Sequence, residues 1–287
     1  MKFSRTRRAA FAAAAIAPFI ALAATSSAVA ETTLERVRKD GYIRVGFANE
    51  APFGFATPDG KLTGEAPEVA KAVFAKMGIE QVDGVLTEFG SLIPGLKAGR
   101  FDVIAAGMFI TPQRCAEINF SEPSYGIGQA MLVEKGNPKG IEDYSSFKAD
   151  TGLKLAVMSG AVERGYAKDA GIAESQVVSL PDQASLVAAV QSKRADAAAL
   201  TALSIAGMAK KVDGLESTKP FDEVAGASVK GHGGFGFRKA DAGLLKAFNE
   251  ELAKFVGFPE HIKLVEPFGF GKDYLPNQTA ADLCTSD

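Results

Sequence analysis

Residues 101–125 decide the fold of this chain and read Phe-Asp-Val-Ile-Ala-Ala-Gly-Met-Phe-Ile-Thr-Pro-Gln-Arg-Cys-Ala-Glu-Ile-Asn-Phe-Ser-Glu-Pro-Ser-Tyr. The stretch predicts an apolar strand, a glycine-containing loop that carries Phe109, and then a helix start. Thr111 is a favourable N-cap, and Pro112 suits the first helical position, where an N–H has no helical partner. We therefore expect Phe109 and Arg114 at the C-terminal edge of a strand, where open α/β sheets bind ligands. An aromatic face beside a guanidinium suits a small ligand with a carboxylate and a flat or cationic body.

Strand and helix patterns alternate on both sides of this stretch. Two series of strand–helix–strand–helix–strand follow one another, which predicts two sheets covered by helices. The expected strands are residues 43–47, 85–87, 101–105, 155–158, 177–179 and 195–200, and the expected helices are 66–77, 91–98, 162–169, 182–192 and 244–255. A short echo favours two similar halves, because Leu92-Ile93-x-x-Leu96-x-x-x-Arg100-x-Asp102 matches Leu186-Val187-x-x-Val190-x-x-x-Arg194-x-Asp196 at an offset of 94 residues.

The chain is predicted to cross between these halves twice. Residues 131–140 pass from an apolar strand into a Gly-Asn-Pro turn, and residues 231–238 form a second, glycine-rich connection that we interpret as hinge. The expected fold class is α/β, with two lobes that each hold a mainly parallel sheet and flanking helices, joined by a two-strand hinge. Such a body can close around a ligand. The expected domains are lobe 1 (residues 31–132 and 232–287) and lobe 2 (residues 133–231).

Residues 1–30 predict a cleaved signal peptide. A basic segment from Lys2 to Arg8 precedes an apolar run from Ala9 to Ala24, and Ala28-Val29-Ala30 fits a cleavage site. We therefore expect export to the periplasm. Without this segment the chain has 28 basic and 34 acidic side chains, a net charge of −6. A mildly acidic chain without basic clusters argues against nucleic acid as a partner.

The chain has only two cysteines and two histidines, which limits the metal sites and catalytic groups that it can form. In an oxidising compartment an isolated pair such as Cys115 and Cys284 usually forms a disulfide, and the alternative is two unrelated buried thiols. His232 and His261 lack metal-ligand spacing. No nucleophile motif is found, and the glycine run at 231–236 lacks the strand-to-helix setting of a nucleotide loop. We expect no metal, no cofactor and no catalysis.

Six motifs follow one another in the order and spacing of a known family. They are Gly41-Tyr-Ile-Arg-Val-Gly-Phe47, Pro52-Phe-Gly-Phe55, Gly60-Lys-Leu-Thr-Gly-Glu65, Leu92-Ile-Pro-Gly-Leu-Lys-Ala-Gly-Arg-Phe-Asp102, Ile110-Thr-Pro-Gln-Arg114 and Phe120-Ser-Glu-Pro123. With them the chain resembles the family-3 extracellular solute-binding proteins, the receptors of polar amino-acid ABC importers. The resemblance implies a type II periplasmic binding protein fold. It also implies a monomer that binds a small molecule and delivers it to an ABC permease in the inner membrane.

The resemblance also implies which residues bind the ligand. Arg114 stands where the family's arginine grips the α-carboxylate, and guanidinium–carboxylate pairing is bidentate. Val162 stands at a helix start whose backbone N–H groups complete the carboxylate site, and it offers no hydroxyl where the family often has Thr. Thr201 occupies the position where many amino-acid binders place an acidic residue for the α-ammonium.

Other positions depart from the amino-acid binders. Glu50 replaces a residue that is commonly aromatic, and Phe109 replaces one that is commonly a small hydroxyl residue. Phe53 in the Pro52–Phe55 motif and Phe89 after the second expected strand add further aromatic side chains, and Phe55 is a secondary candidate. If the family fold holds, the first four converge around the arginine. The alternative for each phenylalanine is core packing.

This combination suits a ligand with a carboxylate at one end and a delocalised, ring-borne cation at the other. Aromatic faces attract cations, and a buried carboxylate such as Glu50 needs a charged or hydrogen-bonding partner. Among family members the chain most resembles the ectoine- and hydroxyectoine-binding receptors, whose ligand is a cyclic amidinium carboxylate. One alternative is a polar or cyclic amino acid as ligand. Another is a periplasmic dehydratase on the same fold, with Glu50 as general acid or base but no visible second catalytic group.

Overall fold

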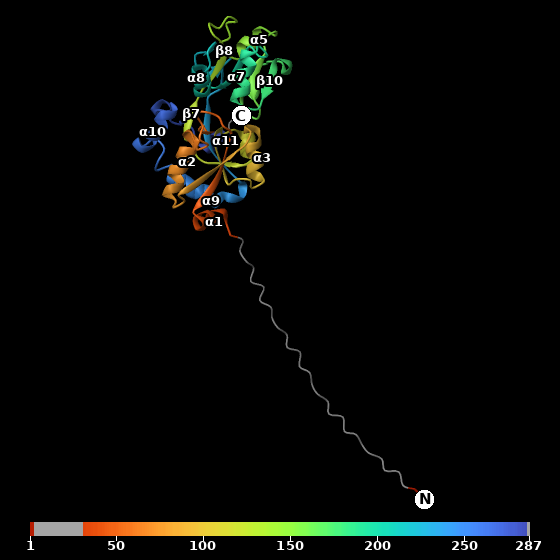
Figure 1. The fold of residues 1–287 in the computed structure, drawn as a ribbon, viewed down its shortest axis with the longest axis vertical. Coiled ribbons are helices and arrows are strands. Elements are labelled where there is room, and N and C mark those ends of the chain that lie inside the picture. Colours follow the sequence, from red (N-terminus) through yellow and green to blue (C-terminus); the bar gives the residue numbers. More distant parts are fainter. Residues whose placement is uncertain (3–30, 286–287) are drawn as a thin grey trace. The chain divides into compact units, whose positions relative to one another are not determined.

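A computed structural model describes residues 1–2 and 31–285 (Figure 1). The predicted signal peptide falls almost entirely on residues 3–30, outside the described part, and stays a prediction. Among the described helices, none is both long enough and apolar enough to cross a bilayer. The described chain forms two mixed β-sheets with flanking helices, together with two small two-stranded sheets.

The first sheet is built by strands from both ends of the chain. Its strands are β1 (Tyr42–Phe47), β4 (Gln81–Leu86), β5 (Val103–Phe109), β6 (Asn119–Phe120), β7 (Tyr125–Ile127) and β15 (Gly231–Phe237). The order is β4–β1–β5–β15–β6, with β7 also on β15; β4, β1 and β5 are parallel, and β15 is antiparallel to its neighbours. The associated elements are α1 (Thr33–Asp40), β2 (Phe55–Ala56), β3 (Leu62–Thr63), α2 (Glu65–Lys76), η1 (Phe89–Ser91), α3 (Leu92–Lys97), α4 (Pro112–Glu117), η3 (Lys239–Asp241), α9 (Ala242–Leu252), α10 (Pro259–Val265), η4 (Glu266–Phe268), η5 (Lys272–Tyr274) and α11 (Ala280–Thr285).

The second sheet uses only the middle of the chain. Its strands are β8 (Gln129–Glu134), β9 (Leu155–Met158), β10 (Val177–Leu180), β11 (Ala197–Thr201) and β12 (Leu215–Ser217). The order is β10–β9–β11–β8–β12; β10, β9 and β11 are parallel, and β8 is antiparallel to both of its neighbours. The remaining elements are α5 (Ser145–Ala149), α6 (Glu163–Asp169), η2 (Glu174–Gln176), α7 (Gln183–Gln191), α8 (Ala202–Lys211), and the hairpin of β13 (Glu223–Val224) and β14 (Ala227–Ser228).

The echo in the sequence corresponds to equivalent contacts in the two sheets. Asp102, just before β5, accepts a hydrogen bond at Oδ2 from the N–H of Arg44 (3.2 Å) and donates its own N–H to the Arg44 carbonyl (2.9 Å). Asp196, just before β11, does the same with Lys154 (2.6 Å and 2.7 Å). Each aspartate therefore ties the start of a central parallel strand to the strand beside it.

The helix start predicted from residues 101–125 is confirmed, but the prediction that Phe109 lies in a glycine-containing loop is wrong. Thr111 caps α4 by accepting the N–H of Arg114 at 3.3 Å, and Pro112 occupies the first turn. Phe109 is the last residue of β5 and pairs with Gly233, because the strand continues through Gly107 instead of ending before it. Phe109 and Arg114 still lie at the C-terminal end of that strand.

Residues 231–238, predicted as a glycine-rich connection, contain a strand instead. Residues Gly231–Phe237 form β15, a strand buried along its whole length between β5 and β6. A Cβ added at Gly231 would lie 2.0 Å from the ring of Phe109, and one at Gly233 would lie 2.2 Å from the ring of Tyr125. Gly231 and Gly233 are therefore present because aromatic rings lie directly on this strand.

Two short segments connect the sheets. Gly128 separates β7 from β8, and residues 229–230 separate β14 from β15. The main chains of Gln129 and Phe221 bond to each other in both directions (2.8 and 2.9 Å) beside the first segment. Sheet membership favours a crossing at Gly128, slightly before the predicted boundary at 132/133, and the division into lobes stays a proposal.

The predicted disulfide is confirmed. Cys115 on α4 is bonded to Cys284 on α11, with Cα atoms 5.6 Å apart. The bond attaches the end of the chain to the helix that carries Arg114. Both helices belong to the part of the chain around the first sheet.

Candidate functional site

Arg114 connects the ends of the two sheets. Its Nη1 donates to the carbonyl of Phe109 at 2.7 Å, and its Nη2 donates to the carbonyl of Gly160, in the loop between β9 and α6, at 2.9 Å. The guanidinium carbon lies 5.5 Å from the centroid of the Phe89 ring. Main-chain oxygens and an aromatic face thus fix the fork in one plane, which suits bidentate binding of a carboxylate.

Glu50 lies in a tight turn that follows β1. Its main chain bonds to Gly54 in both directions (2.8 and 2.9 Å), and its carbonyl also accepts the N–H of Phe53 at 2.8 Å. The side chain is buried, and Oε1 accepts the hydroxyl of Ser204 from α8 at 3.0 Å. Burial raises the pKa of Glu50 to about 8, and repulsion from Glu163 adds to the rise.

Two of the predicted aromatic residues meet on a third that the sequence did not single out. The ring of Tyr125 lies 5.2 Å from that of Phe53 and 6.3 Å from that of Phe109. Its hydroxyl donates to the carbonyl of Gly107 at 2.7 Å, which fixes the ring over β5. Phe89 contacts the guanidinium of Arg114 instead. The rings of Phe53, Phe89, Phe109 and Tyr125 are all buried. Their burial agrees both with core packing and with contact to an enclosed ligand.

Val162 and Thr201 lie at the ends of strands of the second sheet. Val162 is the N-cap of α6, and its side chain makes no capping bond. Thr201 ends β11 at the start of α8 and is buried. Its Oγ1 has no hydrogen-bond partner within the described residues. A buried hydroxyl without a partner is uncommon, because its desolvation is then uncompensated.

Glu163 is a charged residue of the site that the sequence reasoning missed. It opens α6 directly after Val162 and is only 1% exposed. With the Gln129 amide oriented to satisfy its neighbours, that amide donates to Oε1 of Glu163 at 3.0 Å and to the Leu200 carbonyl at 3.2 Å. Burial raises the pKa of Glu163 to about 7, although the backbone N–H of Glu163 itself and, more weakly, Arg114 oppose the rise. The position of Glu163 directly after the predicted ligand contact Val162 was the sequence signal that could have identified it.

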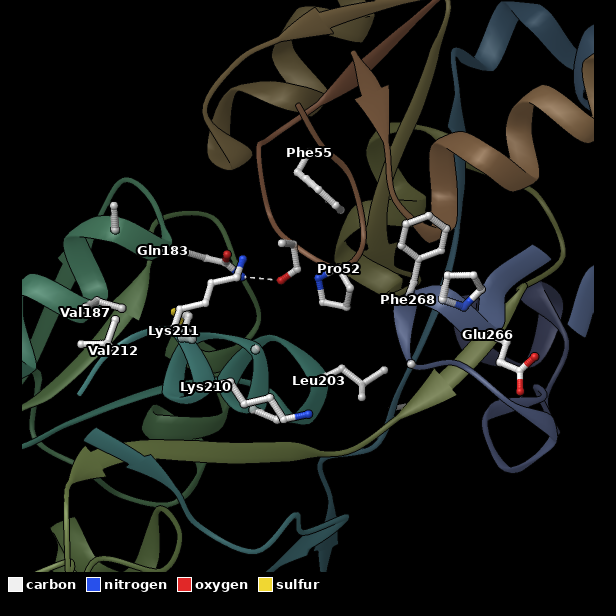
Figure 2. A pocket seen from close by; sticks show the side chains of 17 residues that line it. Pro52, Phe55, Gln183, Val187, Leu203, Lys210, Lys211, Val212, Glu266 and Phe268 are labelled. Carbon is white, nitrogen blue, oxygen red and sulfur yellow. Dashed lines mark hydrogen bonds between the residues drawn. The ribbon is translucent and has the colours of Figure 1, made fainter. Parts of the chain in front are cut away.

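A separate pocket lies beside this group (Figure 2). Its volume is about 510 Å³, and it is lined mainly by apolar side chains of the Ala51-Pro52 turn, α7, α8 and η4, with Lys210, Lys211 and Glu266 also present. The Gln183 side chain donates to the Ala51 carbonyl at 2.8 Å across it. The secondary candidate Phe55 lines this pocket and contacts Phe268, whereas none of the other predicted site residues does.

The two histidines have structural partners. His232 bonds to Asn277 at 2.8 Å, and Nδ1 of His261 accepts the N–H of Gly257 at 3.2 Å. Burial lowers the pKa of His261 to about 4, so this ring is neutral at pH 7. Within the described residues, no group of three or more His, Cys, Asp or Glu side chains could hold a metal ion.

Comparison with known proteins places this arrangement in a family. The model of the bacterial extracellular solute-binding proteins, family 3, matches residues 43–268. The chain belongs to this family. It is therefore a solute-binding protein, and its two mixed sheets with flanking helices are the type II periplasmic binding protein fold that the sequence predicted.

Two curated proteins are similar to this solute-binding protein over most of its length. The probable amino-acid ABC transporter periplasmic-binding protein y4tE of Sinorhizobium fredii is 37% identical over 280 residues, which cover 95% of this chain and 93% of that protein. The lysine/arginine/ornithine-binding periplasmic protein of Escherichia coli is 29% identical over 212 residues. The match covers 71% of this chain and 78% of that protein. Both relatives are binding proteins by name.

Two solved structures are also similar. EhuB in complex with hydroxyectoine has a TM-score of 0.82 and 35% identity, and the match covers 90% of this chain and 99% of that one. The ancestral amino-acid-binding protein AncCDT-1, a precursor of cyclohexadienyl dehydratase, has a TM-score of 0.72 and 29% identity over 83% of this chain and 99% of its own.

Proposed function

We propose that this protein is the periplasmic receptor of an ABC importer and that its ligand is ectoine or hydroxyectoine. The ligand is held between two closing lobes and then delivered to the permease. The similarity to EhuB, whose structure contains hydroxyectoine, supports this ligand class. The amino-acid transporter relatives support the delivery role.

One observation carries the choice of ligand. The carboxylate of Glu50 is buried in the turn that also positions Phe53, and the charge of Arg114 acts on it. Ectoine is a cyclic amidinium carboxylate. Its carboxylate would pair with the Arg114 fork, its flat cation would lie against the phenyl rings, and Glu50 would accept a ring N–H. A bound cation would also offset the cost of ionising a buried carboxylate.

Closure of the lobes is supported by contacts between the two sheets. Arg114 bonds to Gly160, the Gln183 side chain donates to the Ala51 carbonyl at 2.8 Å, and the Ser204 hydroxyl donates to Oε1 of Glu50 at 3.0 Å. We place Phe89, Phe109, Val162 and Thr201 around the same ligand, with Val162 contributing backbone only. Lobe 1 carries Glu50 and Arg114 and lobe 2 carries Val162 and Thr201 in this proposal.

Calorimetric titration tests the proposal. Purified protein is titrated with ectoine, hydroxyectoine, glycine betaine, proline and the common amino acids, and we expect tight binding of ectoine or hydroxyectoine alone. Glu50→Ala and Arg114→Ala should each abolish binding while the thermal unfolding transition remains cooperative. Tight binding of glutamine or arginine without binding of ectoine would overturn the assignment.

A polar amino acid is the second candidate, and one observation favours it. Glu163 places a buried carboxylate beside the strand end where Thr201 lacks a charge, so an α-ammonium could be held from that side. The same titration separates the two ligands. Chromatography of a cyclohexadienyl acid after incubation with the protein tests the dehydratase alternative, and an unchanged acid would contradict it.

A further inference from the structure

The carboxylate of Glu163 is only half satisfied. Its Oε1 accepts the Gln129 amide at 3.0 Å. Its Oε2 is buried and has no hydrogen-bond partner within the part of the chain that the structure describes. A purely structural carboxylate at this depth would normally have donors on both oxygens, because the charged form is costly to bury. One oxygen of Glu163 therefore remains available for a donor from outside the chain.

The Thr201 hydroxyl is a second unsatisfied group on the same side of the second sheet. Thr201 and Gln129 are directly opposite each other in the β11–β8 pair, so their side chains point to the same face. The Gln129 amide reaches Glu163 on that face. Two unpartnered polar groups, one acceptor and one hydroxyl, thus lie around one glutamine.

Glu163 also belongs to the same electrostatic group as the proposed ligand residues. Among the charges that act on Arg114, the attraction to Glu163 is the largest, and Glu50 adds a smaller one. Glu163 in turn repels Glu50. The site therefore contains two carboxylates, one from each sheet region, and a single guanidinium. A ligand carboxylate on Arg114 leaves both acids facing the ligand's cationic end.

From this arrangement we infer that Glu163 is a second acidic contact of the ligand and determines its specificity. Oε2 of Glu163 and the Thr201 hydroxyl receive the ligand cation from one side, and Glu50 receives it from the other. The inference rests on the proposed ligand site and narrows the ligand class. The cation must present N–H donors on two sides, as an amidinium, a guanidinium or an ammonium with several N–H groups does. A quaternary ammonium offers none.

A double-mutant cycle with modified ligands tests this contact. Ectoine and its two ring-N-methyl derivatives are titrated into the wild type, Glu163→Gln and Glu50→Gln. We expect Glu163→Gln to weaken ectoine binding by at least about 30-fold, as removal of one partner of a buried charged contact does. Methylation of one ring nitrogen should cost the wild type a similar factor but add little in Glu163→Gln. Methylation of the other should show the same dependence on Glu50.

The Glu163→Ala variant distinguishes the steric effect of the methyl group from the loss of an N–H contact to Glu163. This variant leaves room at the site, so its preference for ectoine over the matching methyl derivative should disappear. If that preference persists in both Glu163 variants, the contact does not exist. The same conclusion follows if Glu163→Gln binds ectoine as tightly as the wild type does.

Glu65→Gln is the matched control. Glu65 is also buried, has one oxygen without a partner in the described chain and accepts the Ser124 hydroxyl at 2.8 Å, but neither Arg114 nor Glu50 acts on it. We expect unchanged ectoine affinity in this variant. Failure of the wild type to bind ectoine at all would overturn the proposed function instead. Glu163→Gln would then be titrated with whichever amino acid binds, and an unchanged affinity there would overturn the role of Glu163 as well.

Discussion

The hydroxyl of Ser204 donates a hydrogen bond at 3.0 Å to Oε1 of Glu50, and thereby joins helix α8 beside the second sheet to a turn beside the first. The same hydroxyl lies 3.1 Å from the carbonyl of Ala51. Ser204 is fully buried, so this contact forms away from water. It also lowers the pKa of Glu50 and so favours the charged form that a cationic ligand needs.

Replacing Ser204 by alanine should therefore weaken ligand binding about tenfold, mainly through faster dissociation, because a buried hydrogen bond to a charged group is lost. Stopped-flow fluorescence measures the dissociation rate constant, and calorimetry measures the dissociation constant at equilibrium. Ser192→Ala is the control, since the Ser192 hydroxyl bonds only within its own helix region, to Ala188 and Ala189. Equal affinities of the Ser204 and Ser192 variants would show that the contact is not part of closure.

Arg114→Lys keeps the positive charge but removes the planar fork, and should weaken binding at least about 100-fold. A lysine ammonium has three N–H donors, whereas the carbonyls of Phe109 and Gly160 and a bidentate ligand carboxylate together need four. Calorimetry measures the loss. Arg164→Lys, on the exposed face of α6 where Arg164 pairs with Glu174, should bind normally. A lysine variant with near wild-type affinity would mean that charge alone holds the carboxylate.

Much of the fold could be predicted because its elements carry local signals. The central strands β5, β9 and β11 are short buried apolar runs, and caps such as Thr111 and Asp182 mark where helices begin. Strand β15 could not be predicted in this way. Its glycines resemble a flexible connection, and the reason for Gly231 and Gly233 lies in Phe109 and Tyr125, which are more than a hundred residues away in the sequence.

Glu163 was missed for a related reason. An acidic residue in the first turn of a helix usually faces water and interacts with the helix dipole, so it carries no functional signal by itself. Its burial against Gln129 depends on how α6 packs at the end of the second sheet. Arg114 and Glu50, by contrast, could be proposed because their sequence motifs set them apart.

Gly231→Ala should displace the Phe109 ring and reduce both stability and ligand affinity. The new Cβ would lie 2.0 Å from that ring, and overpacking of this kind costs about 1–3 kcal/mol. Thermal unfolding and calorimetry measure the two effects. Adding Phe109→Leu should restore stability but not affinity. Gly243→Ala in α9 is the control, because nothing lies within 4 Å of its Cβ, and it should be slightly stabilising. Unchanged stability of Gly231→Ala would contradict the packing described for β15.

The stability of the ligand-free protein should fall as the pH rises from 6.5 to 8.5. Burial raises the pKa of Glu50 and Glu65 to about 8 and that of Glu163 to about 7, from 4.5 in an accessible glutamate. In this window the folded state therefore holds protons that the unfolded state has released, and stability decreases with pH. The histidines act below this window, because their pKa values are lowered from 6.5.

Differential scanning calorimetry across that pH range measures the slope, and a variant with glutamine at all three glutamates should flatten it. Saturating ectoine should also flatten it, since a bound cation favours the ionised carboxylates at Glu50 and Glu163. A ligand-free melting temperature that rises from pH 6.5 to 8.5 would contradict the burial of these acids.

Cys284→Ser should destabilise the protein and loosen the helix that carries Arg114. The disulfide closes a loop with a sequence separation of 169, and the loss of so large a constraint on the unfolded chain costs up to about 5 kcal/mol. Other contacts then hold α4 and α11 in place, among them the Lys239 side chain on the Cys115 carbonyl (2.6 Å) and Glu122 on the N–H of Ala280 (3.0 Å). We expect a lower melting temperature and a modestly faster ligand dissociation, but a folded protein. Reduction of the wild type with dithiothreitol should reproduce both effects and leave Cys284→Ser unchanged, because the chain has only two cysteines. Equal melting temperatures of the oxidised and reduced wild type would show that the bond contributes no stability.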